Sequence, residues 1–170
     1  MSRAEPLMTI PVGVVIERRK AKSAWADFVW RPVAVLPGIS DASPWTTLGG
    51  TPECMNFYAG ASEIELYRAD TAGYRDNLAT GTPQLWVALR PTGAEPPYGI
   101  VAITAEPSEG EAFNETATNL VEAMPMPGSI RSAVAAFVAK HHLEHPFVKR
   151  QRDRADPEAM ARRSPIKDRP

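Results

Sequence analysis

Apolar and polar residues alternate over much of this chain. Val12, Val14 and Ile16 recur at every second position within residues 9–19, which is the period of a strand with one buried face. Alternation or short apolar runs recur in residues 26–36, 55–68, 74–78, 85–90 and 98–105, and each segment predicts a strand. The polar break at residues 20–23 favours an antiparallel hairpin between the first two strands. The unbroken apolar run at 98–105 predicts burial on both faces.

The clearest helical pattern lies near the C-terminus. Ser129 is a candidate N-cap, and the apolar positions that follow it have the spacing of one helix face. These positions are Ile130, Ala133, Val134, Phe137, Val138 and His141. They predict an amphipathic helix that ends near Leu143. Residues 115–123 predict a shorter helix, whereas residues 39–52 and 106–114 have the composition of loops.

Together these elements predict an α+β fold. We expect a mainly antiparallel sheet or partly closed barrel of five to seven strands, with one C-terminal amphipathic helix. The strands do not alternate with long helices, which disfavours a doubly wound parallel sheet. The chain has 17 prolines among 170 residues, and this excess disfavours an all-helical bundle because proline breaks helix interiors. We therefore expect one α+β domain over residues 1–148 and a flexible, disordered tail over residues 149–170.

Charge is distributed unevenly between these two parts. Residues 1–148 carry 11 basic and 16 acidic side chains, whereas residues 149–170 carry eight basic and four acidic ones. The basic tail begins with Lys149, Arg150, Arg152 and Arg154. Three interpretations of this tail remain open: a solvated end, a segment that docks onto an acidic protein surface, and a nucleic-acid contact. The tail has no aromatic residue to stack on bases, which disfavours the nucleic-acid contact. Trp45, in the loop predicted at 39–52, is the candidate for an exposed aromatic contact with a partner.

Motifs that would carry catalysis are missing from the sequence. Neither of the glycine-rich patterns that hold nucleotide phosphates, GxxxxGK[ST] and GxGxxG, occurs. Glu63 and Glu65 share a strand face, and alternation makes this an ordinary solvent-facing position. Cys54 has no base near it in the sequence, so we expect a small buried side chain rather than a nucleophile. The sequence thus supplies no catalytic residue, and we expect a protein that is not an enzyme.

The three histidines of the chain lie close together. His141 and His145 are four residues apart, so they share a helix face if the helix extends that far. Such a pair suits a transition metal, but a tetrahedral site needs two further ligands. His141 also continues the apolar stripe of the predicted helix. We expect these histidines to be structural, and we predict no metal site and no cofactor.

The N-terminal region contains no targeting pattern. No run reaches the roughly 18 apolar residues that cross a bilayer, and the first apolar stretch, residues 10–16, is too short for a secretory signal. A single cysteine excludes an internal disulfide and fits a reducing compartment. We expect a cytoplasmic protein with no membrane association.

Several long strings resemble those of a proteobacterial family of unknown function. The similar segments are PVGVVIERRKAKSAWADFVWRPVAVLPG (11–38), FYAGASEIELYRADTAGYRDNL (57–78), QLWVALRP (84–91), MPMPGSI (124–130) and FVAKHHLEHPFVKRQRDRADPEA (137–159). Genes of that family commonly neighbour those of molybdenum-dependent formate dehydrogenase. Its members often carry the name molybdopterin-guanine dinucleotide biosynthesis protein A. Such a guanylyltransferase opens with a glycine-rich loop, whereas the first predicted strand here continues into Glu17-Arg18-Arg19-Lys20, so the name does not fit the residues.

The resemblance implies a role beside formate dehydrogenase. We expect a non-catalytic accessory or assembly factor whose partners are formate dehydrogenase subunits or their maturation proteins, and we do not expect a nucleic-acid partner. The alternative is a cofactor-handling enzyme or a binder of a pterin or nucleotide ligand. In that case four arginines are candidate phosphate contacts, although surface ion pairing with nearby Asp and Glu side chains is the favoured explanation for them. They are Arg31, Arg68, Arg75 and Arg90.

Overall fold

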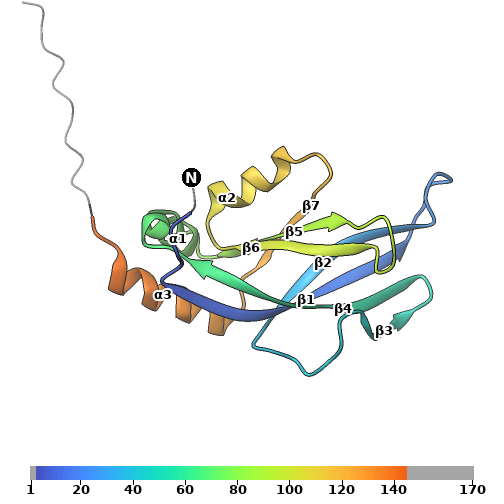
Figure 1. The fold of residues 1–170 in the computed structure, drawn as a ribbon, viewed down its shortest axis with the longest axis horizontal. Coiled ribbons are helices and arrows are strands. Elements are labelled where there is room, and N and C mark those ends of the chain that lie inside the picture. The colour runs from blue at the N-terminus through green and yellow to red at the C-terminus, as the bar shows by residue number, and fades with distance from the viewer. Residues whose placement is uncertain (1–2, 145–170) are drawn as a thin grey trace, which may run out of the picture.

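Seven strands form one mixed sheet that curls into a nearly closed barrel (Figure 1). The computed structural model describes residues 3–144. The strands are β1 (Met8–Lys20), β2 (Phe28–Pro37), β3 (Thr46–Thr51), β4 (Cys54–Leu66), β5 (Gln84–Pro91), β6 (Tyr98–Thr104) and β7 (Leu120–Pro125). Their order is β2-β1-β4-β6-β5-β7, and β3 pairs with the N-terminal part of β4. Contacts between β2 and β7 bring the two outer strands together, so the predicted α+β class and the partly closed barrel are confirmed.

The barrel interior is filled by the alternating positions that the sequence predicts. Val12, Val14 and Ile16 of β1 are completely buried, as are Leu85 and Leu89 of β5. Each fully buried aliphatic side chain contributes about 1.5–3 kcal/mol of transfer free energy. These residues form one continuous core with the buried residues of β4 and of the C-terminal helix. The barrel is therefore a packed body, and functional groups have to lie at its ends, seams and outer face.

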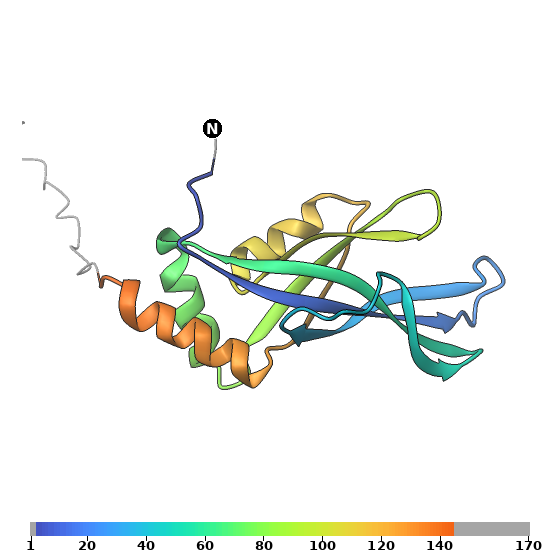
Figure 2. The same ribbon diagram turned by 60° about the horizontal axis from the view of Figure 1, so that its bottom comes forward.

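Helices cover one end and one side of this barrel. They are α1 (Thr71–Ala79), α2 (Pro107–Ala112) and α3 (Gly128–His141), with short 3₁₀ turns at η1 (Arg68–Asp70) and η2 (Phe113–Glu115). Figure 2 shows α3 lying beside α1 at the end of the barrel. Helix α3 buries Ile130, Val134 and Phe137, so the predicted C-terminal helix and its apolar face are confirmed. Its N-cap is Pro127 rather than Ser129, and no side chain caps it.

Two predicted elements have the wrong secondary structure. Residues 74–78 were expected to form a strand but lie within helix α1, whose buried face consists of Thr71, Tyr74 and Asn77. Two of these three side chains are polar, so no apolar stripe marks the helix. Residues 115–123 were expected to form a helix, but strand β7 begins at Leu120 and pairs with β5.

Three further expectations about loops and burial are also wrong. Helix α2 occupies part of residues 106–114, where the Glu106 side chain caps the helix by accepting a hydrogen bond from the Glu109 backbone N–H. Strand β3 occupies part of residues 39–52, and its residues are all exposed. Strand β6 is not buried on both faces, because Val101 is 41% exposed. The domain boundary predicted at residue 148 lies outside the described residues.

Strands β4 and β6 meet in a parallel seam. Their pairing consists of one bridge, Ile64 opposite Ile103, among the described residues. All other strand pairs are antiparallel and have longer registers. The seam joins the ladder of β1 to β4 with the ladder of β5 to β7. No helix within residues 3–144 is long and apolar enough to cross a membrane.

Candidate functional site

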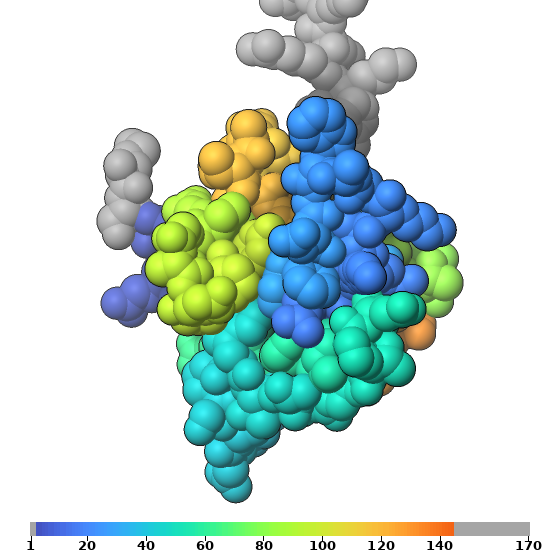
Figure 3. All heavy atoms as spheres, turned by 90° about the vertical axis from the view of Figure 1, so that its right-hand side faces the viewer, coloured from blue at the N-terminus to red at the C-terminus, as the bar shows by residue number. Residues whose placement is uncertain are grey.

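Three hairpin tips gather at the end of the barrel opposite α3 (Figure 3). The tips join β1 to β2, β3 to β4 and β5 to β6. The first concentrates positive charge, and we call residues 17–31 the basic hairpin. Its cations are Arg18, Arg19, Lys20, Lys22 and Arg31, against the two carboxylates Glu17 and Asp27. The rest of residues 3–144 is acidic, so this hairpin is the basic region of the part of the chain that the structure describes.

Strand alternation divides the basic hairpin into two faces. Val14 and Ile16 point into the core, so Arg18 continues their face, and it lies opposite Trp30 in the β1–β2 register. Glu17 and Arg19 lie on the other face, with Glu17 opposite Arg31. A register shift between Val15 and Ile16 produces this pairing. The two faces therefore carry different chemistry, aromatic on the inside and ionic on the outside.

On the outer face, one carboxylate oxygen holds two arginines. Glu17 Oε1 accepts a hydrogen bond from Arg19 Nε at 3.1 Å and from Arg31 Nε at 3.2 Å. Glu17 is only 8% exposed, whereas both arginines are about half exposed. The Arg19 hydrogen bond lowers the pKa of Glu17 against the opposing effect of burial, and Glu17 in turn raises the pKa of Arg19. The carboxylate is thus ionised and orients both guanidinium groups.

A cavity of about 300 Å³ opens on this ionic face. It is lined by Glu17, Arg19, Lys20, Ala21, Lys22, Val29 and Arg31. Four of the seven lining residues are cations and one is a carboxylate. The cavity is therefore suited to an anion.

On the inner face, aromatic rings close the mouth of the barrel. Trp30 contacts Trp45 edge-on at a centroid distance of 5.9 Å, Phe57 at 5.8 Å and Tyr98 at 6.2 Å. The Arg18 guanidinium lies against these rings, 5.3 Å from the centroid of Phe57, and its Nε is buried without a hydrogen-bond partner within the described residues. Cation–π contacts of this kind hold an arginine without an ion pair.

The predicted partner contact Trp45 belongs to this aromatic mouth. It is half-buried, and its backbone has φ of 66°, in the left-handed region, with its N–H donating to the Tyr58 carbonyl. Trp45 therefore packs on Trp30 and Phe57 rather than standing free. The other predicted partner contacts, Lys149, Arg150, Arg152 and Arg154, lie outside the described residues.

A tryptophan that the sequence analysis did not select is the exposed one. Trp25 lies in the turn of the basic hairpin and is 96% exposed. Phe28 and Val29, the first two residues of β2, are 38% and 54% exposed. The sequence contained a signal for this exposure, because Trp25 lies two residues after the polar break at residues 20–23, where a hairpin tip faces solvent.

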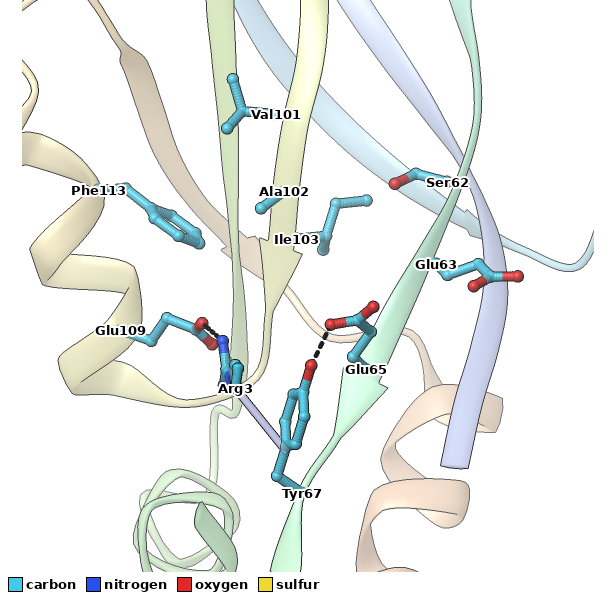
Figure 4. Close-up of a pocket in the computed structure, with 10 residues that line it drawn as sticks. All are labelled: Arg3, Ser62, Glu63, Glu65, Tyr67, Val101, Ala102, Ile103, Glu109 and Phe113. Carbon is cyan, nitrogen blue, oxygen red and sulfur yellow. Dashed lines mark hydrogen bonds and ion pairs between the residues drawn. The ribbon is translucent and has the colours of Figure 1, made fainter. Parts of the chain in front are cut away.

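A second cavity, of about 320 Å³, lies at the β4–β6 seam (Figure 4). Arg3 enters it from the N-terminus and forms ion pairs with Glu109 and with Asp70, the latter at 3.1 Å. The Arg3 guanidinium also stacks 3.9 Å from the Tyr67 ring centroid. The Tyr67 hydroxyl donates to Glu65, and burial together with this bond raises the pKa of Tyr67. These contacts attach the N-terminal segment to the barrel, so we assign this cavity a structural role.

The carboxylate pair considered in the sequence is found at this seam. Glu63 and Glu65 are both exposed and both line the cavity, on the solvent-facing side of β4. Glu65 is occupied by the Tyr67 hydroxyl. The alternation that predicted their common, solvent-facing side is confirmed.

The histidines and the cysteine lie at opposite ends of the barrel. The His141 ring packs 4.6 Å from the Phe137 ring, and His142 contacts Arg75 and Thr71 at the base of α1. Cys54 starts β4 beside Arg19, at the hairpin end. No group of three or more His, Cys, Asp or Glu side chains that could hold a metal occurs within residues 3–144, and His145 lies outside them.

The four arginines considered as phosphate contacts are on four different elements. Arg31 lies on β2 and pairs with Glu17 of β1, whereas Arg68 lies on η1. Arg75 pairs with Asp76 and Glu144, and Arg90 donates to Asn119. The structure does not assemble them into one site, but it brings Arg31 together with Arg19 instead.

A family model matches residues 11–151, from β1 to beyond α3, and the description of that family is a protein of unknown function, DUF3305. The chain belongs to this family. No curated protein and no solved structure matches it. The matched segment of this DUF3305 protein includes the whole basic hairpin and the aromatic mouth.

Proposed function

We propose that this DUF3305 protein is a non-catalytic accessory factor that binds a protein of the molybdenum-dependent formate dehydrogenase system, for maturation or regulation of that enzyme. The observation that carries the docking role is the basic hairpin, where Trp25 in the turn is 96% exposed and Val29 near the start of β2 is 54% exposed. A tryptophan side chain held out in water is the kind of anchor that dominates protein interfaces. The enzyme system comes from the sequence resemblance of residues 11–38, a segment that includes this tip.

The charge around the anchor specifies the kind of partner. Lys20, Lys22 and Arg31 line the same cavity as Val29, on the hairpin that carries Trp25. Charges at the rim of an interface steer encounter and select partners of opposite sign. The predicted basic tail at 149–170 would add a second contact of the same sign. We therefore propose a partner with an acidic surface that surrounds an apolar groove.

Affinity co-purification with mass spectrometry in a native host tests this proposal. The baits are the full chain, a chain ending at Val148, and the full chain with Trp25→Ser. The matched control is Ile39→Ser, which changes another exposed apolar residue, 76% exposed, outside the hairpin.

We expect formate dehydrogenase subunits or maturation proteins with the full chain and the control, and their loss with Trp25→Ser. Loss on truncation at Val148 alone would move the docking role to the tail. Recovery of no such protein by any bait would contradict the proposed function.

A further inference from the structure

The outer face of the basic hairpin has hydrogen-bonding capacity that its own contacts do not use. Arg19 and Arg31 each bind Glu17 through Nε, at a shared oxygen. An arginine has five N–H donors in a rigid fork, so this contact leaves the terminal nitrogens of both residues available. Within the described residues, Glu17 and the neighbouring Cys54 account for the interactions of the two guanidinium groups.

The fixed carboxylate gives these donors a defined direction. Glu17 is buried and its position is set by the β1–β2 register, in which it lies opposite Arg31. Two guanidinium groups brought this close would repel each other, and the shared carboxylate offsets that repulsion. Donors held in place before a ligand arrives lose less conformational entropy on binding than free side chains do.

Charge and size together define the ligand class. The cavity in front of the arginines carries four cations and one carboxylate, since Lys20 and Lys22 complete its rim. A net charge of about +3 exceeds what a single carboxylate ligand neutralises and suits a phosphate dianion or a diphosphate. The volume, about 300 Å³, is at the lower limit for small-molecule sites, so it admits a phosphate group but no large cofactor.

We propose that the Glu17-held pair Arg19 and Arg31, with Lys20 and Lys22 at the rim, forms a binding site for a phosphate dianion or diphosphate group. Paired arginine forks give bidentate, charge-assisted hydrogen bonds to phosphate oxygens, about twice as strong as neutral ones. The apolar Val29 and Ala21 form part of the wall. This site goes beyond the proposed docking function and does not depend on it, because it needs no partner protein.

The proposal is tested by titrating the full chain with pyrophosphate. Calorimetry and NMR of the arginine Nε and Nη resonances monitor the binding. We expect saturable binding and shifts in the resonances of Arg19 and Arg31. Arg19→Gln/Arg31→Gln removes both forks and should weaken binding at least about tenfold. Arg131→Gln/Lys140→Gln is the matched control, because it removes the same two positive charges at exposed residues of α3; its affinity should stay within about twofold. Since the predicted basic tail is present in every variant, its attraction for pyrophosphate cancels in the comparison.

A second variant separates fork geometry from charge. Arg19→Lys/Arg31→Lys keeps every positive charge but loses the planar donors, so it should still weaken pyrophosphate binding several-fold. Circular dichroism checks that each variant folds. Equal weakening in the site and control variants, or full affinity with the lysine variant, would overturn the site in favour of diffuse charge attraction.

Sedimentation with lipid vesicles decides whether the phosphate group belongs to a soluble ligand or to a lipid. Full chain is sedimented with vesicles of phosphatidylcholine alone and of phosphatidylcholine mixed equally with phosphatidylglycerol. Pyrophosphate binding that depends on Arg19 and Arg31, with equal sedimentation on both vesicles, supports a soluble phosphate ligand. Sedimentation that requires phosphatidylglycerol and these arginines supports a lipid phosphate. If neither pyrophosphate binding nor sedimentation on phosphatidylglycerol vesicles depends on these arginines, the proposal is overturned.

Discussion

Asn77 is the polar side chain on which the attachment of α1 to the barrel depends. It is 3% exposed. Its Nδ2 donates to the carbonyls of Gln84 at 2.8 Å and Ala105 at 2.9 Å, and its Oδ1 accepts from the Gln84 N–H at 3.0 Å. One side chain thus joins the helix to the start of β5 and to the residue that follows β6.

We expect Asn77→Ala to destabilise the protein by about 3 kcal/mol. Each of the three hydrogen bonds contributes about 1 kcal/mol net, and the backbone groups of Gln84 and Ala105 would remain partly buried without a partner. For a chain of this size, about 1 kcal/mol changes the melting temperature by about 2–4 °C. The variant should therefore melt roughly 6–12 °C lower.

Asn77→Asp distinguishes hydrogen bonding from packing. The substitution keeps the volume of the side chain, but a carboxylate oxygen would replace the amide that faces two carbonyl oxygens. We expect a loss at least as large as that of Asn77→Ala. Urea unfolding followed by far-UV circular dichroism measures both, with Asp76→Ala as control because the Asp76 side chain is 71% exposed. If either variant at position 77 lost less than about 1 kcal/mol, the assigned role of Asn77 would be refuted.

Three other outcomes follow from the contacts. Gly110→Ala should destabilise the protein by about 1–3 kcal/mol in thermal melts, because a Cβ there would lie 2.2 Å from the Trp86 ring, whereas Gly128→Ala, with no neighbour within 4 Å, should not. The pKa of Glu17 is lowered in the folded protein, so ionised Glu17 adds to the free energy of unfolding above its ordinary pKa of 4.5, and this contribution is lost as pH falls through the folded-state pKa. Glu17→Gln should therefore flatten the acid limb of a curve of stability against pH, and an unchanged limb would contradict this. Trp25→Ser should leave the urea midpoint within error, since Trp25 is 96% exposed, and a clear drop would place it in the core.

Strong periodicity in the sequence translated directly into structure. The helix spacing of Ile130, Val134 and Phe137 predicted the buried face of α3, and the alternation of Val12 and Val14 predicted the core side of β1. In both cases apolar burial is the dominant force, so the pattern of side chains is sufficient.

Helix α1 could not be predicted in the same way. Its buried face includes Thr71 and Asn77, which are satisfied by hydrogen bonds to groups on distant segments or to the preceding turn. A polar residue that is buried because of a tertiary partner carries no local signal. Strand β7 was missed for a related reason, since its pairing with β5 determines its conformation.

The candidate site depends on a backbone irregularity that composition does not reveal. An unbroken register from the pair Val15–Ala34 would place Glu17 opposite Pro32, but the bulge after Val15 places it opposite Arg31. The sequence showed Arg19 and Lys20 only as charges before a polar break. Their convergence with Arg31 around one carboxylate required the structure.

The β4–β6 seam has a consequence for how the chain folds. Among the described residues, the ladders of β1 to β4 and of β5 to β7 share one backbone bridge, Ile64 with Ile103. Each ladder is held by several successive antiparallel pairs, whereas joining the two ladders closes the loop between Ile64 and Ile103 for a single bridge, so few backbone contacts offset its cost in chain entropy. We expect the two ladders to behave as separate cooperative units in native-state hydrogen exchange. Amides along the seam should exchange first, and the joining of the two ladders should be the late event in folding.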